Sequence, residues 1–175
     1  MRIFAVLATA LIVAGAGCAS VMQPGGETGS VQVKNGQGQT DGTATLTQLS
    51  NGVRVILDAR GLPPGEKGVH VHEVGRCEGP AFTSAGGHFN PDKKQHGLQN
   101  PGGPHAGDLP NITIGSDGTG RLETLTDRIS LSAGAKSVFD ADGSAIVIHA
   151  APDDFKTDPT GNSGARIACG VIVKQ

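Results

Sequence analysis

The sequence predicts an all-β domain, an antiparallel sandwich or flattened barrel, and three observations support this prediction. Eight short segments alternate apolar and polar residues or are rich in β-branched residues. Turn dipeptides separate these segments, and no stretch of ten or more residues keeps a helical period. Many short strands joined by regular turns typically form a sandwich or a barrel. The expected strands cover residues 31–34, 43–49, 53–59, 68–73, 111–115, 120–126, 144–150 and 166–173.

Three dipeptides mark the tightest expected turns. Asn51-Gly52 stands between two alternating segments and is the strongest hairpin signal in the chain. Asp117-Gly118 and Asp142-Gly143 offer the same chemistry, because Gly and Asp tolerate the positive φ that tight turns require.

The composition fits one folded domain and excludes a nucleic-acid-binding surface. The 175 residues include 28 Gly and 10 Pro, a high share that still falls short of low-complexity disorder, and the length suits one hydrophobic core. There are 14 basic and 16 acidic residues, without long runs, and neither Trp nor Tyr. A nucleic-acid surface needs a basic stripe and often aromatic stacking platforms, so we expect no nucleic-acid partner.

Residues 1–17 have the pattern of an export signal. A positively charged start precedes an apolar run over 3–13, and small residues lead from it to Cys18. The run is shorter than the roughly 20 residues that span a membrane. We expect Cys18 to be the lipid-modified first residue of a bacterial lipoprotein. Ordinary cleavage after Ala16 is the alternative, because Gly15 stands where lipoprotein signals usually carry an aliphatic residue.

Residues 18–29 then form a Gly- and Pro-containing tether, and residues 30–175 form the folded domain. We therefore expect an exported protein of the periplasm or cell envelope that touches a membrane only through a lipid at Cys18. The sequence leaves open whether the domain is a monomer or a homodimer.

Two cysteines remain after Cys18, at positions 77 and 169. In an oxidising compartment we expect Cys77 and Cys169 to form a disulfide, with two free buried thiols as the alternative. Closing a loop of about 90 residues would stabilise the fold by roughly 4 to 5 kcal/mol in the chain-entropy model.

Between Glu73 and Asn111 lie 37 residues with hardly any strand or helix pattern, rich in Gly, Pro, Asn and His. A structureless stretch of this length in a compact domain is expected to be functional or to be held by something other than hydrophobic packing. Metal ligands would hold such a loop in place.

The six histidines carry most of the functional information. In Val69-His70-Val71-His72 the alternation sends both imidazoles to one face of a strand, although a lone His-x-His can be an accident of the surface. The long loop adds His88, His96 and His105, and Asp108 follows three residues after the last of these. Three imidazoles and a carboxylate are typical of a closed tetrahedral zinc site. His149 ends another expected strand, from which it can reach the face of His70 and His72.

These residues together carry a resemblance to a known family. The chain from Ser30 to Gln175 resembles the copper,zinc superoxide dismutases. The matching pieces are Gly68-Val69-His70-Val71-His72-Glu73 with Cys77, Ser84-Ala85-Gly86-Gly87-His88-Phe89-Asn90-Pro91, His96, His105, Asp108, and Gly161-Asn162-Ser163-Gly164-Ala165-Arg166-Ile167-Ala168-Cys169-Gly170. The resemblance implies an eight-stranded antiparallel Greek-key barrel or sandwich with a long metal-binding loop and a shorter electrostatic loop.

The resemblance also implies a role for each matching residue. One copper per chain would be held by His70, His72, His88 and His149, and one zinc by His88, His96, His105 and Asp108, so that His88 bridges the two ions. Asp153 would hydrogen-bond His70 and His96 and so fix the orientation of both rings. The alternative interpretation of Asp153 is a solvated acid in a loop. Arg166 would be the active-site arginine beside the copper. Lys156 could help to steer the substrate, although a plain solvated lysine is the better reading.

The function implied is the dismutation of superoxide, the small-anion substrate, to dioxygen and hydrogen peroxide at a copper that cycles beside a structural zinc, with His88 supplying a proton. Such an enzyme would protect the cell envelope from superoxide outside the cytoplasm. A metal carrier of the same fold and a structural or adhesive surface domain are the alternatives, although neither needs the full set of ligands and Arg166.

Overall fold

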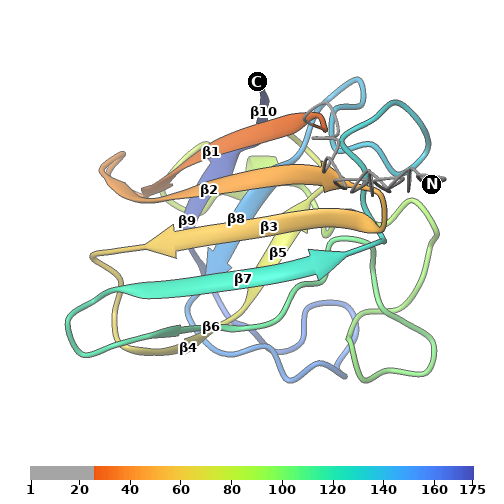
Figure 1. Cartoon of the computed structure of the whole chain (residues 1–175). Helices are drawn as coiled ribbons and strands as arrows, with labels where there is room; N and C mark the ends of the chain where they lie inside the picture. The colour runs from red at the N-terminus through yellow and green to blue at the C-terminus, as the bar shows by residue number, and fades with distance from the viewer. Residues whose placement is uncertain (1–25) are drawn as a thin grey trace, which may run out of the picture.

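The computed structural model describes residues 26–175 as ten β-strands joined by turns and loops, with one short 3-10 helix (Figure 1). The strands are β1 (Thr28–Asn35), β2 (Thr40–Leu49), β3 (Gly52–Ala59), β4 (Gly65–Lys67), β5 (Val69–His72), β6 (Ile112–Ile114), β7 (Gly120–Thr126), β8 (Ala145–His149), β9 (Arg166–Val171) and β10 (Val173–Lys174), and the helix is η1 (Thr83–Ala85). The expected export signal and Cys18 lie outside the described residues.

Eight of the strands form one curled sheet in which every pair is antiparallel. Its order is β5-β8-β9-β1-β2-β3-β7, with β10 beside β1, while β4 and β6 form a separate two-stranded ladder. The chain crosses from one end of this order to the other between β3 and β5, and again between β7 and β8. These crossings give the Greek-key arrangement, and the predicted all-β fold is confirmed.

Several strand boundaries differ from the prediction, and β4 was not predicted. Three of the differences follow from backbone hydrogen bonds. The expected strand 68–73 is shorter, because Gly68 N–H donates to Ala151 O instead of to a neighbouring strand of the ladder, and β5 begins at Val69. The expected last strand is interrupted at Ile172, whose N–H donates to Ser144 O. β1 starts at Thr28, inside the expected tether, because Thr28 already pairs with Thr47 of β2.

The turns agree with their sequence signals. β2 and β3 form a hairpin in which Leu49 pairs with Gly52, so Asn51 lies in the turn and Gly52 opens the next strand with φ of 139°. Gly118 has φ of 77° in the turn from β6 to β7, where Thr119 N–H donates to Asp117 Oδ1.

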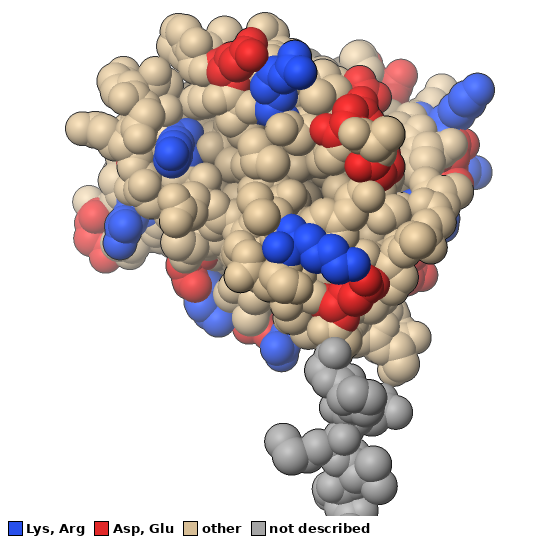
Figure 2. Space-filling view, turned by 90° about the horizontal axis from the view of Figure 1, so that it is seen from above, with Lys and Arg blue, Asp and Glu red and all other residues tan. Residues whose placement is uncertain are grey.

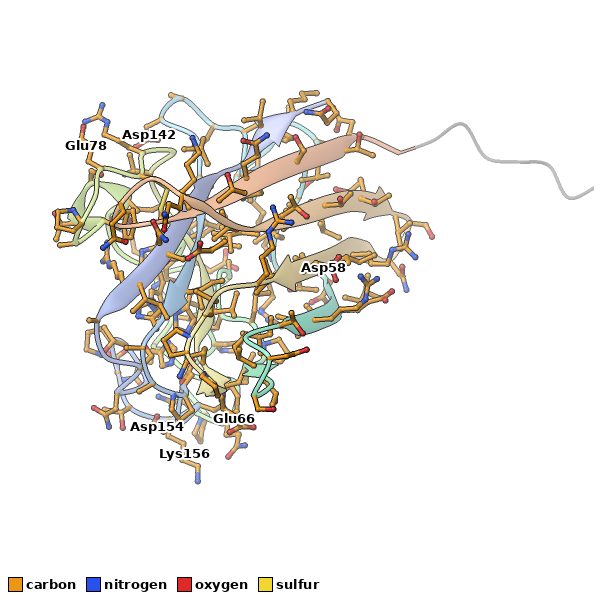
Figure 3. The ribbon with its side chains drawn as sticks, turned by 90° about the vertical axis from the view of Figure 1, so that its left-hand side faces the viewer. Asp58, Glu66, Glu78, Asp142, Asp154 and Lys156 are labelled. Carbon is orange, nitrogen blue, oxygen red and sulfur yellow. A yellow bond between two sulfur atoms is a disulfide. The ribbon has the colours of Figure 1, made fainter. Side chains whose placement is uncertain are left out.

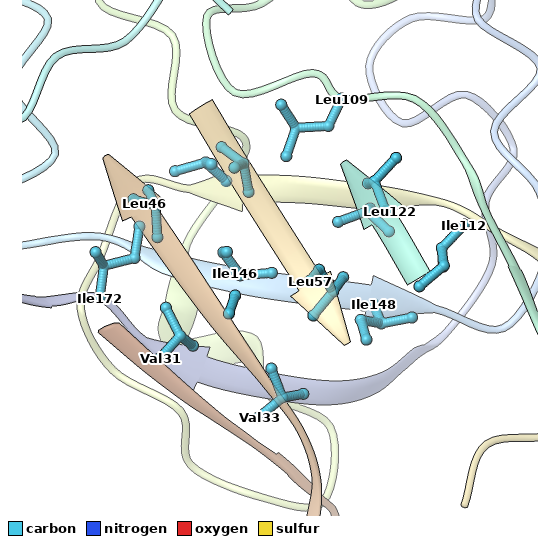
Figure 4. Close-up of a cluster of buried hydrophobic side chains, with 14 of the residues drawn as sticks. Val31, Val33, Leu46, Leu57, Leu109, Ile112, Leu122, Ile146, Ile148 and Ile172 are labelled. Atoms are coloured by element: carbon cyan, nitrogen blue, oxygen red, sulfur yellow. The ribbon is translucent and has the colours of Figure 1, made fainter. Parts of the chain in front are cut away.

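The alternating strands bury one face in a single large core between the two halves of the curled sheet (Figure 4). On β1, Val31 and Val33 point inward while Gln32 and Lys34 are exposed, as a period of two requires. Leu46 and Leu57 from β2 and β3 meet Ile146 and other side chains of the opposite strands. Each such side chain contributes roughly 1.5–3 kcal/mol by leaving water, so this core fixes the strands that carry the histidines.

The long segment between β5 and β6 is irregular as predicted, with η1 as its one regular element. Within residues 26–175 no helix has the length and apolar character to cross a membrane.

Candidate metal centre

Strand β5 presents two histidines to a single buried site. Val69 and Val71 pack in the hydrophobic core, and the alternation places His70 and His72 on the other face, where both are fully buried. A pair of imidazoles on a strand that is packed on both faces has little freedom to move.

The long loop folds back along β5, which is the last strand of the sheet. Val71 N–H donates to Gly107 O, Phe89 N–H to Val71 O, and Gly107 N–H to Phe89 O, each at 2.8 Å. Position 107 has to be glycine, because a Cβ there would overlap Val71 O. This pairing brings His88 beside His72 and brings Asp108 beside His70.

One group consists of four buried histidines, His70, His72, His88 and His149, whose ligand atoms lie within 4.8 Å of one another. His149 reaches it from the end of β8, where the pairing with β9 shifts register between Ile148 and His149. In each ring one nitrogen is buried without a hydrogen-bond partner, namely Nδ1 of His70 and Nε2 of His72, His88 and His149.

The other nitrogen of each ring is occupied. Nε2 of His70 donates to Asp153 Oδ2 at 2.8 Å, Nδ1 of His72 to the carbonyl of Gly86 at 3.0 Å, and Nδ1 of His149 to the carbonyl of Gly164 at 3.2 Å. Since a carbonyl or carboxylate oxygen can only accept, it fixes the proton on the nitrogen it contacts and leaves the lone pair on the other. The four partnerless nitrogens therefore suit a cation.

Burial keeps these imidazoles neutral. It lowers the pKa of His70 to about 3, of His72 to about 2 and of His149 to about 4, and it lowers the pKa of His88 as well. The contact of His70 with Asp153 opposes this shift without cancelling it. At neutral pH the lone pairs are consequently available to a metal ion without competition from protons.

A second group lies directly beside the first. His88, His96 and Asp108 meet with Nδ1 of both rings 3.0 Å from Asp108 Oδ1. Nδ1 of His105 lies 3.3 Å from Nδ1 of His88 and 3.4 Å from Asp108 Oδ1. His70 is also within reach of this group, but its Nε2 is bonded to Asp153, so His105 is the better fourth donor.

These separations fit a tetrahedral ion. Bonds of about 2.0–2.1 Å, usual for zinc with nitrogen or oxygen, give tetrahedral edges of about 3.3–3.4 Å. Nδ1 of His88 and Nδ1 of His105 lie 3.3 Å apart beside the Asp108 carboxylate. A bound cation would hold these three groups together. His88 belongs to both groups, with Nδ1 in the second and a partnerless Nε2 for the first.

The Asp108 carboxylate is the centre of the second group. Its Oδ2 accepts the N–H groups of Gly97 and His105, each at 2.9 Å. Although burial by itself would raise the pKa of Asp108, hydrogen bonds from His105, His88 and His96 hold it far below its usual range. For His96, burial would lower the pKa, but contacts with Asp108 and Asp153 outweigh it and raise the pKa to about 9.

Asp153 links the two groups. Besides its contact with His70, its Oδ1 lies 3.0 Å from Nε2 of His96. Gly161 closes over this contact with φ of 61°, and a Cβ at that position would overlap Asp153 Oδ1. The buried carboxylate thus orients one ring of each group.

Arg166 stands at the mouth of the four-histidine group. Its Nη1 donates to Phe82 O and its Nη2 to Gly86 O, both at 2.7 Å. Together with His72, His88 and His149 it lines an open cleft of about 660 Å³. Burial lowers the pKa of Arg166, but a guanidinium still carries its charge at neutral pH.

The predicted disulfide between Cys77 and Cys169 is confirmed, with a Cα–Cα distance of 5.6 Å. It ties the segment that contains the Phe82 and Gly86 carbonyls to β9, the strand that begins at Arg166. The disulfide and the two bonds of Arg166 therefore hold that segment at both ends.

Lys156 takes no part in this arrangement. Its side chain is exposed and points away from the body of the molecule (Figure 3), and it does not line the cleft. Arg166 is the one Lys or Arg side chain among the described residues that line the cleft, and charges of both signs are scattered over the face in Figure 2.

Sequence reasoning missed two side chains that support the second group. Arg128 Nη2 donates to Asp108 O at 2.6 Å, and Asp158 Oδ1 accepts the His96 N–H at 2.6 Å. Both contact backbone atoms, for which the sequence carries no signal.

An antiparallel β-barrel with two adjoining groups of buried metal-ligand residues, with the His88 ring between them, defines a metalloprotein that can hold a pair of metal ions. Comparison with known proteins gives the family. The family model for copper/zinc superoxide dismutase (SODC) matches residues 40–172. The chain belongs to the copper/zinc superoxide dismutase family.

Individual relatives agree with this assignment. Superoxide dismutase [Cu-Zn] 1 of Aquifex aeolicus is 51% identical over 80% of this chain and 84% of its own length, and superoxide dismutase [Cu-Zn] of Caulobacter vibrioides is 46% identical over 80% and 82%. Among solved structures, a SOD-like protein from Bacillus subtilis matches with a TM-score of 0.78 and 43% identity, covering 81% of this chain and 96% of that chain.

Proposed function

We propose that this protein is a superoxide dismutase that holds copper in the four-histidine group and zinc in the group around Asp108. The four buried ring nitrogens without partners, which converge below Arg166, are the observation that carries the proposal. The copper ligands are then His70, His72, His88 and His149, and the zinc ligands are His88, His96, His105 and Asp108.

A copper ion held by His70, His72, His88 and His149 would supply the one-electron chemistry, accepting an electron from one superoxide and returning it to the next. Over both halves, two superoxide anions and two protons become dioxygen and hydrogen peroxide. The residues of this chain have to bind the anion, supply a proton and keep the rings in place.

Arg166 binds and orients the anion. Its guanidinium is fixed by two carbonyl oxygens, which leaves its remaining donors and its charge for the cleft. The domain carries no strong net positive charge, with 14 basic against 16 acidic residues in the whole chain. Attraction of a small anion therefore depends on this local charge in the cleft.

His88 supplies the proton. Nδ1 faces Asp108 and His105, so the ring would stay in place while Nε2, which has no hydrogen-bond partner, takes up a proton. Nε2 then holds one proton in one half of the cycle and releases it to the second superoxide in the other half. Asp153 keeps His70 and His96 in their tautomers throughout, because it accepts from Nε2 of both rings.

We further propose that residues 1–17 direct export, that Cys18 carries the lipid, and that the folded domain protects the cell envelope from superoxide. The order of charged start, apolar run and small residues before Cys18 supports the proposal. Intact mass of the protein purified from membranes tests it, with Cys18→Ser as the control. Cleavage after Ala16 without added lipid mass would contradict it. Sedimentation of the released domain would then decide between a monomer and a homodimer.

Metal analysis and a superoxide consumption assay test the activity. We expect one copper and one zinc per chain and a fast loss of superoxide that stops when a copper chelator removes the copper. Copper and zinc without superoxide consumption would indicate a metal carrier, and neither metal would indicate a structural or adhesive domain.

A further inference from the structure

His88, His96 and His105 each turn Nδ1 toward the second group, and for two of these rings the surroundings of the other nitrogen, Nε2, have already been described. Nε2 of His88 is turned to the copper group, and Nε2 of His96 contacts Asp153 Oδ1 at 3.0 Å. For His105 the facing group is Asp158, whose Oδ1 lies 3.8 Å from Nε2. Like His96, His105 therefore has a carboxylate facing its Nε2, on the side of the ring away from Asp108.

Asp158 uses the same oxygen for a backbone contact. Oδ1 accepts the N–H of His96 at 2.6 Å, a short and therefore strong hydrogen bond to a charged acceptor. The contact to His105 is longer than a hydrogen bond and acts through charge. A single atom from the loop 152–164 therefore touches two of the three histidines around Asp108.

The loop holds Asp158 firmly even though its side chain is 46% exposed. Asp154 Oδ1 accepts the N–H groups of Lys156 and Thr157, and its Oδ2 accepts from Thr157 Oγ1 and Asn162 Nδ2. Asn100 of the long loop donates to Lys156 O as well as to His96 O. The carboxylate is thus presented from a closed turn that is already bonded to the metal loop.

A cation on Nδ1 of His105 changes the chemistry at Nε2. The ring must keep its proton on Nε2, and the metal draws electron density from the ring, so the N–H becomes more positive. A facing carboxylate then stabilises the metal-bound form of the ring more than the free form. Carboxylates in this position fix ring orientation and raise metal affinity.

We propose that Asp158 is a positioning residue that raises the affinity of this group for zinc by orienting His96 through its backbone and His105 through its charge. The inference rests on the zinc ligands proposed above. It assigns to the loop 152–164 a second carboxylate, beside Asp153, that acts on the metal centre.

Two variants separate the contributions. Asp158→Ala removes both the acceptor and the charge, while Asp158→Asn keeps an oxygen that can accept the His96 N–H and removes the charge. Asp92→Asn is the matched control, because Asp92 is a similarly exposed acid of the long metal-binding loop that forms an ion pair with Lys136 and contacts none of the histidines. Zinc affinity of the copper-free protein is measured by competition with a chromophoric chelator, and the ligand field by the absorption spectrum of bound cobalt.

We expect Asp158→Ala to weaken zinc binding by roughly 10–100-fold, the usual effect of losing such a carboxylate, and Asp158→Asn to weaken it less. The cobalt spectrum should change in both variants, while copper affinity stays the same because no copper ligand contacts Asp158. Asp92→Asn should behave as the unaltered protein.

Zinc affinity equal to that of Asp92→Asn, with an unchanged cobalt spectrum, would overturn the proposal. An equal loss of zinc and copper affinity together with a lower melting temperature of the metal-free protein would also overturn it, since Asp158 would then only fasten the loop. Unaltered protein that holds no zinc would instead refute the zinc ligand set itself, before any variant is made.

Discussion

Removing the Cys77–Cys169 disulfide should destabilise the metal-free protein by about 4.6 kcal/mol. The two cysteines are separated by 92 residues. In the chain-entropy model, a cross-link over a loop of that length removes about 16 cal/mol/K from the unfolded chain, which gives this free energy at 25 °C. The double variant Cys77→Ala/Cys169→Ala tests the value, because alanine leaves no polar group in the buried position of Cys169.

The same variant should also reduce catalysis. The disulfide holds one end of the segment whose carbonyls at Phe82 and Gly86 fix Arg166. With that end free, the guanidinium is less often in the orientation that captures the anion. We expect kcat/KM to fall while copper and zinc content stay the same, because no proposed ligand lies within residues 77–86 and His72, which contacts the Gly86 carbonyl, is itself held by the pairing of β5 with β8.

Urea unfolding of the metal-free protein measures the stability, and a superoxide assay over a series of salt concentrations measures the catalysis. Unaltered protein treated with a reductant provides the control, since it loses the bond without a substitution. A loss of stability below about 1 kcal/mol would refute the entropic reasoning. Unchanged kcat/KM in the double variant would refute the link from the disulfide to Arg166.

Three further substitutions test the site and the core. Arg166→Ala should keep both metals, lower kcat/KM by about tenfold or more and weaken the dependence of kcat/KM on salt. Arg121→Ala, which removes an exposed charge on β7, should leave kcat/KM and its salt dependence unchanged. Equal salt dependence in the two variants would refute the steering role of Arg166. His149→Ala should lose copper and retain zinc, whereas His105→Ala should lose zinc and retain copper. Elemental analysis that shows parallel loss of both metals in either variant would contradict the division of ligands. Leu46→Ala, at a fully buried position, should lower the free energy of unfolding by about 2–5 kcal/mol. Leu125→Ala, at a position that is 47% exposed, should change it little. Similar losses in urea unfolding of the two variants would mean that the core is not where we place it.

The sequence predicts what depends on local pattern. Period-two alternation located the strands of the core, and in β5 it also placed His70 and His72 on the face opposite the valines. The absence of any pattern marked the long loop correctly, since its conformation comes from its contacts with β5 and not from its own residues. The single remaining pair of cysteines indicated the disulfide, which the structure confirms.

What the sequence could not predict depends on backbone atoms and on distant partners. The start of β5 at Val69 instead of Gly68 arises from a hydrogen bond of Gly68 to Ala151, more than 80 residues later. The anchoring of Arg166 uses two carbonyl groups, and every residue has one. Asp158 resembles any solvated loop acid until the fold brings it against the His96 N–H.

The position of β5 at the end of the sheet has a consequence for solubility. An end strand usually offers unpaired N–H and C=O groups to which another chain can add a strand. Here Phe89 and Gly107 satisfy those groups on β5, and the ligands His88 and Asp108 adjoin them in the chain. Ions held by His88 and Asp108 would therefore also keep this end of the sheet covered, so we expect metal-free protein to self-associate more readily than metal-loaded protein.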